Sequence, residues 1–461
     1  MVPFMARAHD PYEIEGVDRG RGRSPEKRSF FPFLLLMTFL VGALLLSPLP
    51  FTLQRALGMT EKKEKEVTEE PVVVPEPKVI EKTVEVVREK AIPYYHPENG
   101  MSVARTSRGF DFRSGVREEQ GDLATKERVR SGSYEAQYTI TVHRPRASDS
   151  IDELEKTTPG LVKLLPELAE MVETARVSPF FKTLYDNKKK RIEDRADDLG
   201  RLLTKHNYYD CQTMLEMEAA SGQKVFLLQG DMDVVSDGSD GDRLSSMPEK
   251  IITSSYYQPF TSYFWKKRTK RENPMVRGWR QRISNAKAEI LAGTADTDRI
   301  DWLKRRITYL ENGIRNMQKS SYLVAEYDPF IVMPVYIITD RKSAWGPNVG
   351  DYAAVIYEGK IYPAIVGDGG PNFKVGEASL KMAKRLNKKA TPNYRPVSTL
   401  GVTYIVFPRT SGKWAQPDYE LWSAEVAKYL EKIGGLGAGY ELEKWEPFPQ
   451  ELAAGAALSQ Q

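Results

Sequence analysis

The stretch DYAAVIYEGKIYPAIVGD, Asp351–Asp368, decides the fold that the sequence predicts. Apolar residues alternate with other residues on both sides of a central Glu-Gly-Lys, and such alternation is typical of β-strands. Because Gly favours tight turns, we predict a β-hairpin whose tip lies in YEGKIY, Tyr357–Tyr362. Its second strand ends at Asp368, directly before a run of turn residues.

Further strands and helices surround this hairpin in the sequence. The strand-like stretches are KVFLLQGDMDVV (224–235), YYQPFTSYFW (256–265), FIVMPVYIIT (330–339) and GVTYIVFP (401–408). Apolar residues at helical spacing predict helices at Leu161–Val177, Phe180–His206, Glu377–Leu386 and Asp418–Ile433. The fold class is therefore mainly β with helical insertions, α+β overall, and we place this domain at residues 149–433.

Residues 266–320 interrupt the strand-rich pattern. Their apolar positions step by three and four along Ile300, Leu303, Ile307, Leu310, Ile314 and Met317. A second series precedes GTADTD, Gly293–Asp298, which carries good helix-capping residues. We predict an antiparallel helical hairpin that packs on its own domain. Self-association through this seam is the alternative, although each half is shorter than three heptads.

The N-terminal region predicts a membrane anchor. FFPFLLLMTFLVGALLL, Phe30–Leu46, contains no charge and is just long enough to span a bilayer as a helix. Basic residues crowd its N-terminal side, which favours a cytoplasmic tail at 1–28, an anchor at 29–50 and a C-terminal domain outside the cytoplasm. The alternative is a cleaved signal peptide and a secreted protein. Residues 51–148 predict a charged stalk and a partly disordered linker, and residues 434–461 a flexible tail.

Composition limits the chemistry. The chain holds 67 Lys and Arg against 63 Asp and Glu, so its net charge of +4 gives no basic field for nucleic acid over the whole protein. One Cys and four scattered His leave no Cys-based zinc site and no His cluster. We therefore expect no metal and no cofactor.

Two carboxylates stand out in GDGGPNFKVGEAS, Gly367–Ser379. Asp368 ends the predicted strand, and Glu377 is expected to open a helix. The Gly- and Pro-rich connection between them can fold back and bring both side chains to one place. Glycoside hydrolysis needs two carboxyl groups across the scissile bond. The alternative is a plain turn followed by a Glu that stabilises a helix N-terminus.

A second acidic run, GDMDVVSDGSDGDR, spans Gly230–Arg243. The ligand order of an EF-hand fails here because Val235 occupies the third position. We expect Asp231, Asp233 and Asp237 to form a negative wall that binds a cationic amino sugar, and the outer aspartates to be a solvated loop. Trp345, in the turn-like SAWGPN, is a candidate platform for a sugar ring.

Taken together, these pieces resemble glycoside hydrolase family 75, the fungal-type chitosanases. GDMDVVSDG is similar to the D-M-D-x-D-x-D-G segment of that family, and GDGGPNFKVGEAS to its G-D…G-E-A-S segment. YIVFP, Tyr404–Pro408, and LYDNKKK, Leu184–Lys190, resemble its closing strand and its entry helix. The similarity covers roughly Val177–Lys432, with departures at Val235 and Ser236.

The resemblance implies a β-barrel-like core, with Asp368 and Glu377 as the catalytic pair. It implies internal cleavage, with inversion, of a β-1,4-linked glucosamine polymer such as chitosan, so the expected partner is an amino-sugar polysaccharide. Two alternatives to this hydrolase stay open. They are a lytic transglycosylase acting on peptidoglycan and a non-catalytic glycan-binding scaffold of the envelope.

Overall fold

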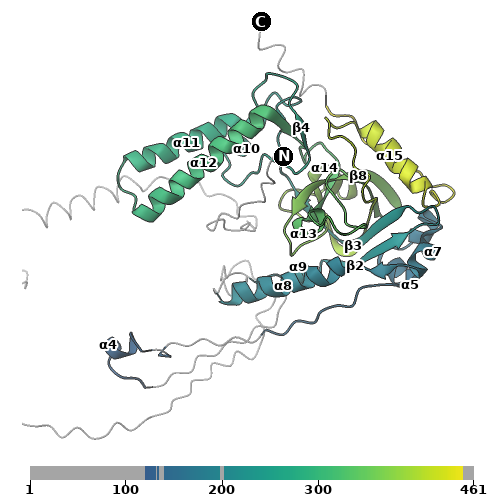
Figure 1. The fold of residues 1–461 in the computed structure, drawn as a ribbon, viewed down its shortest axis with the longest axis horizontal. Coiled ribbons are helices and arrows are strands. Elements are labelled where there is room, and N and C mark those ends of the chain that lie inside the picture. The colour runs from purple at the N-terminus through teal and green to yellow at the C-terminus, as the bar shows by residue number, and fades with distance from the viewer. Residues whose placement is uncertain (1–119, 131, 134–139, 198–201, 450–461) are drawn as a thin grey trace, which may run out of the picture. The chain divides into compact units, whose positions relative to one another are not determined.

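The computed structural model describes residues 120–130, 132–133, 140–197 and 202–449 (Figure 1). Contacts divide the chain into two units. The short helix α4 (Ala124–Glu127) belongs to one of them, and residues 140–449 belong to the other. Within these ranges, no helix is both long enough and apolar enough to cross a bilayer. The anchor predicted at 29–50 lies outside the described residues.

A closed six-stranded barrel forms the core of the larger unit. The strands follow one another around the barrel in the order β3 (Lys224–Val235), β10 (Val397–Val406), β7 (Tyr352–Tyr357), β8 (Lys360–Gly370), β6 (Phe330–Pro334) and β9 (Glu377–Ser379). β9 pairs back onto the second half of β3, which closes the barrel. The first half of β3 also pairs with β2 (Cys211–Glu218), which in turn pairs with β1 (Arg176–Val177). The expected barrel-like core is confirmed.

Side chains alternate between two apolar clusters along the barrel strands. In β10, Tyr404 and Val406 lie in the larger cluster, which fills the barrel interior. Ile405 and Phe407 lie in a second cluster on the outer face. The helices that cover this face are α5 (Ile151–Thr157), α6 (Leu161–Leu164), α7 (Leu168–Glu173) and α15 (Tyr419–Glu431).

The hairpin predicted within Asp351–Asp368 is confirmed as β7 and β8. Tyr357 pairs with Lys360, so Glu358 and Gly359 form a two-residue turn with φ of 49° and 72°. Positive φ at both central residues is the geometry of the turn that matches the twist of paired strands.

Prolines and caps explain where the predicted elements differ from the structure. The helix predicted at Leu161–Val177 is broken into α6 and α7 around Pro166, because proline removes a helical hydrogen bond. Phe180–His206 forms α8 (Pro179–Asp197) and the short α9 (Lys205–Tyr208). β6 ends at Pro334, and α13 (Val335–Ile338) replaces the rest of that predicted strand. In YYQPFTSYFW only the end is extended, as β4 (Phe264–Lys266).

The predicted helical hairpin is confirmed as α11 (Met275–Leu291) and α12 (Thr297–Lys319), which lie side by side (Figure 1). Asp296 caps α12 by accepting a hydrogen bond from the backbone N–H of Arg299. β4 pairs with β5 (Ser320–Tyr322) and closes the base, while α10 (Glu249–Ile252) packs on α11. Leu303 and Leu310 of the seam are buried inside this assembly, so the seam gives no support for self-association.

The packed domain extends beyond 149–433 at both ends. The hydroxyl of Thr213 donates to the carbonyl oxygen of Ser148 at 2.6 Å. After the predicted boundary, the backbone N–H of Glu443 donates to Ile361, and the indole of Trp445 donates to Pro363. Over 434–449, part of the predicted flexible tail, the aromatic side chains of Trp445 and Phe448 pack against the barrel.

Candidate active site

The strand registers place three acidic residues in one row across the barrel. Asp368 on β8 pairs with Val332 on β6, and Glu377 on β9 pairs with Asp233 on β3. β6 and β9 are antiparallel with Ile331 opposite Ala378, so the next position brings Val332 opposite Glu377. Neighbouring strands lie about 4.8 Å apart, so the Cα atoms of Asp368 and Glu377 are about 10 Å apart, two strands from each other.

A β-bulge at Gly367 turns Asp368 towards the face that carries Glu377. The register advances by one residue on β6, from Ile331 to Val332, but by two on β8, from Val366 to Asp368. Without the extra residue, Asp368 would share the face of Val366, which lies in the interior cluster. Bulges commonly redirect a side chain in this way beside a functional site.

The two carboxyl groups are brought closer by the lean of Glu377 over β8. A Cβ placed on Gly370 would lie 2.7 Å from Oε2 of Glu377, so this carboxylate lies against the strand that carries Asp368. Asp368 is 5% exposed and Glu377 is 7% exposed, so both residues are largely buried. The site thus contains two carboxyl groups on one face, on neighbouring parts of the barrel wall.

Gly367 cannot be replaced without strain. A Cβ at this position would lie 2.6 Å from Cβ of Phe330 and 2.7 Å from Leu323. We expect Gly367→Ala to lower the free energy of unfolding by about 1–3 kcal/mol, as overpacking does, and to disturb the position of Asp368. Denaturant unfolding measures the first effect. Gly412→Ala is the control, because a Cβ there meets no atom within 4 Å; equal losses in both variants would contradict this role of the bulge.

Ser262 holds the carboxyl group of Asp368. Oδ1 accepts from the backbone N–H of Ser262 at 2.8 Å, from its hydroxyl at 2.7 Å and from the N–H of Gly369 at 2.8 Å. The Ser262 hydroxyl also accepts from the N–H of Gly369. These contacts fix the orientation of the side chain relative to the barrel wall.

Glu377 lies in a strand and not at a helix start, which corrects the prediction. Helix α14 (Leu380–Leu386) begins later because the Ser379 hydroxyl caps it by accepting from the N–H of Met382. The charge that faces Glu377 is instead the ammonium of Lys374, 3.1 Å from Oε1. The same ammonium lies 2.6 Å from Oδ2 of Asp233, so Lys374 bridges two residues of the acidic row.

Asp231 and Asp233 each contact a basic side chain, so they do not form the bare negative wall that we expected. The guanidinium of Arg395 contacts Asp231 at 2.6 Å and Asp233 at 3.1 Å. Burial by itself would raise the pKa of Asp233, but Lys374 and Arg395 outweigh it and lower the pKa to about 2. Asp233 therefore stays ionised between two basic side chains.

The pKa of Asp231 is raised, whereas that of Asp233 is lowered. Its side chain is almost fully buried, and Oδ1, which lies against Gly376, has no hydrogen-bond partner within the described part of the chain. Burial is the largest cause that raises the pKa of Asp231 to about 8; Arg395 opposes it, while Asp210 and Asp233 add to it. Asp210 in turn is paired with the fully buried Lys188 at 2.8 Å.

Asp231→Asn should change how stability depends on pH. The unfolded chain releases the Asp231 proton near 3.8, whereas the folded protein keeps it up to about 8, so this residue destabilises the fold as pH rises through that window. We expect the variant to gain stability relative to the wild type between about pH 5 and 8. Denaturant unfolding of the wild type and the variant at both pH values measures this gain. The same difference in stability at both pH values would refute the prediction. Asp301→Asn, at an exposed position, is the control.

The outer part of the acidic run is structural, which corrects the expected solvated loop. Asp240 is buried and accepts from the backbone N–H of Asp242 and from Arg243. Asp242 accepts from the N–H groups of Arg268 and Thr269 at the base of the helical hairpin. Asp237 is half-buried, and its carbonyl accepts from Ala325. These aspartates tie the loop to its neighbours.

Trp345 lies apart from the carboxylates. Its indole donates to the carbonyl of Met217, and the ring packs under Arg176 and Lys224. Lys224 begins β3, whereas Asp233 is nine residues further along, which is about 30 Å of strand. The structure therefore does not bring Trp345 to the row that holds the other candidates.

Sequence reasoning missed three residues of the site. Lys374 lies three positions before Glu377 in the stretch already singled out, so its spacing was a usable signal. Ser262 and Arg395 reach the site from distant segments, and no local pattern marks them. Among the described residues, His, Cys, Asp and Glu side chains form no group of three or more that could hold a metal.

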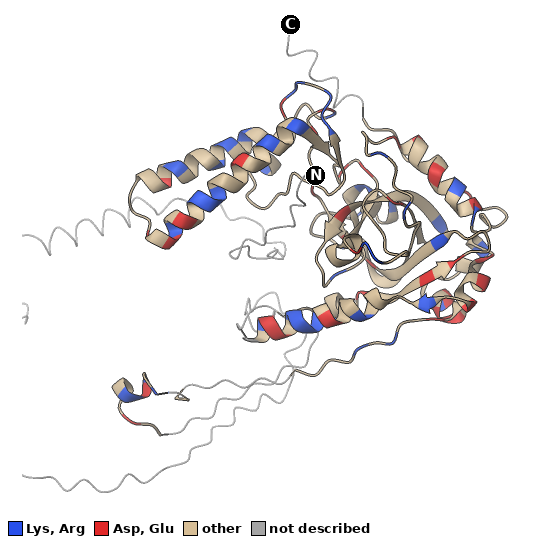
Figure 2. Ribbon diagram, viewed as in Figure 1, with Lys and Arg blue, Asp and Glu red and all other residues tan. Residues whose placement is uncertain are grey.

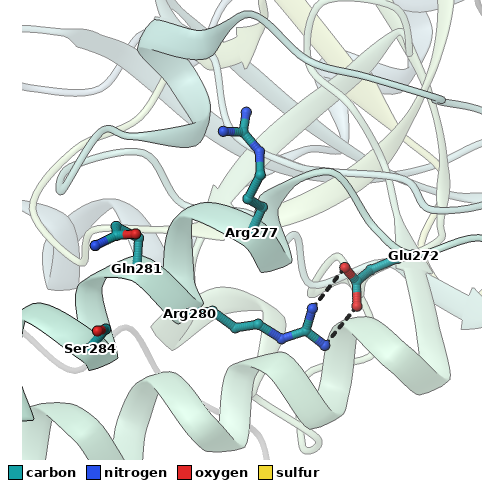
Figure 3. Close-up of a pocket in the computed structure, with 5 residues that line it drawn as sticks. All are labelled: Glu272, Arg277, Arg280, Gln281 and Ser284. Carbon is teal, nitrogen blue, oxygen red and sulfur yellow. Dashed lines mark hydrogen bonds and ion pairs between the residues drawn. The ribbon is translucent and has the colours of Figure 1, made fainter.

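A surface hollow of about 520 Å³ lies elsewhere, beside α11 (Figure 3). Glu272, Arg277, Arg280, Gln281 and Ser284 line it. Arg280 is paired with Glu272 within the hollow, and Arg277 with Glu249. Its lining shares no residue with the carboxylate row.

Comparison with known proteins connects part of the chain to a family. A search of curated proteins finds no match to the chain. The family model described as "Fungal chitosanase of glycosyl hydrolase group 75" matches residues 232–439. The matched part begins within β3 and contains Asp233, Asp368, Glu377, Lys374 and Arg395. This match supports a glycosyl hydrolase group 75 domain, and with it a glycosidase, in this part of the chain.

Proposed function

We propose that this protein cleaves a β-1,4-linked glucosamine polymer internally, with inversion, and that Asp368 and Glu377 are its catalytic acid and base. The observation that carries the proposal is the shared row. A bulge and two strand registers bring these two carboxyl groups to one face of the barrel, within the part matched by the chitosanase family.

The separation of the two strands favours inversion. Inverting glycosidases hold their carboxyl groups roughly 6.5–9.5 Å apart, because a water molecule must fit beside the sugar, whereas retaining enzymes hold them about 5 Å apart. The Cα atoms of Asp368 and Glu377 lie two strands apart, and Glu377 leans over Gly370. This arrangement suits the larger carboxyl separation of inverting enzymes. One carboxyl would protonate the leaving oxygen, while the other removes a proton from the attacking water.

Asp233 is the proposed contact for a substrate amine. Its side chain is 22% exposed, and it lies next to Glu377 in the row. Asp231 would support it through the shared Arg395. We do not extend the proposal to Trp345, whose surroundings place it away from the row, or to Asp237, which is half-buried beyond the end of β3.

Release of reducing ends tests this function. Full-length protein, purified in a non-ionic detergent, is incubated with chitosans of graded acetylation, and the anomer first formed is recorded by NMR. We expect short oligomers released with inverted configuration. Anhydro-sugar products would instead indicate a transglycosylase, and polymer binding without cleavage a scaffold; either result would refute the proposal.

The proposal includes a membrane tether. It rests on the uncharged Phe30–Leu46 run, and it places the barrel domain outside the cytoplasm. Recovery of the protein in the membrane fraction after carbonate washing, and its loss on removal of that run, would be the supporting result.

A further inference from the structure

The helical hairpin carries a charge unlike that of the rest of the chain. Residues 266–320 contain 15 Lys and Arg but only six Asp and Glu, a net charge of +9. The whole chain has a net charge of +4, so the remainder is net negative, at −5. Figure 2 shows the blue bands that follow α11 and α12. The candidate catalytic row takes no residue from this segment.

Six exposed cations of the hairpin have no carboxylate partner among the described residues. We call them the basic stripe: Lys266, Arg268, Lys270, Arg305, Arg315 and Lys319. Arg315 contacts the neutral side chain of Asn312. Five other cations of the hairpin contact carboxylates: Arg277, Arg280, Lys287, Arg299 and Lys304. The stripe is therefore a part of the hairpin where exposed positive charge is left over.

The fold gathers these cations into one line. Arg305, Arg315 and Lys319 lie within about a quarter turn on one side of α12, over about 21 Å of helix. At the end of α12, the backbone N–H of Lys267 donates to the carbonyl of Lys319, and Lys266 pairs with Ser320. The β4–β5 ribbon thus joins the KKRTKR segment, residues 266–271, to the cations of the helix.

The charge and the exposed side chains of the basic stripe indicate which kind of partner it can bind. A polycationic glucosamine polymer would be repelled, so the stripe is no part of a substrate groove. Leu291, an exposed large apolar side chain of the hairpin, lies at the opposite end from the β4–β5 base, so the stripe offers no apolar residue to a bilayer. Binding of single-stranded nucleic acid uses exposed aromatic side chains that stack on the bases, and no aromatic residue within 266–320 is exposed.

We propose that the basic stripe binds a linear polyanion of the carboxylate-bearing polysaccharide class. This choice of polymer rests on the proposed function, because a cationic amino-sugar polymer associates with polyanionic glycans by charge. Binding to the polyanion would hold the barrel domain on a mixed material in which its substrate is embedded. The attraction is electrostatic, so it weakens as salt rises.

Binding to alginate, a polyuronate, tests the proposal. Full-length protein in non-ionic detergent is titrated with labelled alginate, with neutral dextran as the blank. The test variant changes four cations of the stripe: Lys266→Gln, Arg305→Gln, Arg315→Gln and Lys319→Gln. The matched control changes four exposed cations elsewhere: Lys182→Gln, Lys189→Gln, Lys384→Gln and Lys428→Gln. We expect at least about a tenfold increase in Kd for the test variant and about twofold or less for the control.

Several outcomes would overturn the proposal. These are no alginate binding by the wild type at low salt, an equal loss in both variants, or tighter binding of the stripe to duplex DNA or to phosphatidylglycerol vesicles than to alginate. Glu377→Gln separates this inference from the hydrolase proposal, because it should abolish cleavage and leave alginate binding unchanged. Alginate binding by a protein that shows no glycosidase activity would support the proposed role of the basic stripe and refute the proposed hydrolase function.

Discussion

Glu377→Gln is expected to reduce the rate of chitosan hydrolysis by about 10²–10⁴-fold, the range that a positioned acid or base contributes. The substitution keeps the shape of the side chain, but an amide can neither give nor take the proton that the reaction needs. Asp368→Asn should have a similar effect, and its amide oxygen can still accept from Ser262. Reducing-end release under identical conditions measures both.

The controls make this expectation sharp. Glu358→Gln, at the exposed turn between β7 and β8, and Asp301→Asn, on the surface of α12, make the same chemical changes away from the row. Both should keep wild-type activity. If Glu377→Gln or Asp368→Asn retains more than about a tenth of the wild-type rate while folded, that residue does not have the acid–base role we propose for it.

The second large effect concerns stability. Lys188 is fully buried, and it contacts the carboxylate of Asp210 at 2.8 Å and the carbonyl of Asn207 at 2.6 Å. Lys188→Met leaves Asp210 buried without its cation, which costs about 3–5 kcal/mol. Most domains have only about 5–15 kcal/mol of stability in total, so this variant should unfold at much lower denaturant concentration.

The loss of stability in Lys188→Met should increase with pH. Burial raises the pKa of Asp210, and the ammonium of Lys188 opposes that rise. Without Lys188 the pKa rises further, so the folded protein is penalised more as pH increases, and the loss should be greater at pH 8 than at pH 5. Lys188→Met combined with Asp210→Leu should recover stability, and Lys189→Met, at the exposed next position, should be nearly neutral. No recovery in the double variant would argue against the ion-pair explanation.

This pair also connects stability to the candidate site. Asp210 accepts from the backbone N–H of Val375, in the loop between β8 and β9 that carries Lys374. The same loop is held by Asn187, whose amide donates to the carbonyl of Asn372. Loss of Lys188 should therefore also displace Lys374 from Glu377.

The elements that could be predicted were those with a strong local pattern. The alternating run of β7 and β8 and the seam of α12 each bury a periodic apolar face, and periodicity is visible in sequence. The approximate place of the carboxylate pair followed from turn residues between Asp368 and Glu377. These features depend on residues that are close together in the chain.

What could not be predicted depends on pairing between distant segments. Glu377 was expected to start a helix because Leu380 and Ala383 share a helical spacing. Instead, Ser379 takes the capping position, and the strand that begins at Glu377 pairs with β3 and β6. The bulge at Gly367 is a property of the register with β6. The guanidinium that contacts both Asp231 and Asp233 belongs to Arg395, more than 160 residues further along.

Because β3 pairs with three other strands, it limits where a recombinant fragment of this protein can begin. One strand pairs with β2 and β10 along its first half and with β9 along its second, so it belongs at once to the wall and to the closure of the barrel. A recombinant fragment that begins at Met232, where the family match begins, would discard Lys224–Asp231 and leave β10 without most of its neighbour. Boundaries chosen for expression should therefore start upstream of α5, because sequence homology here ends in the middle of a cooperative folding unit.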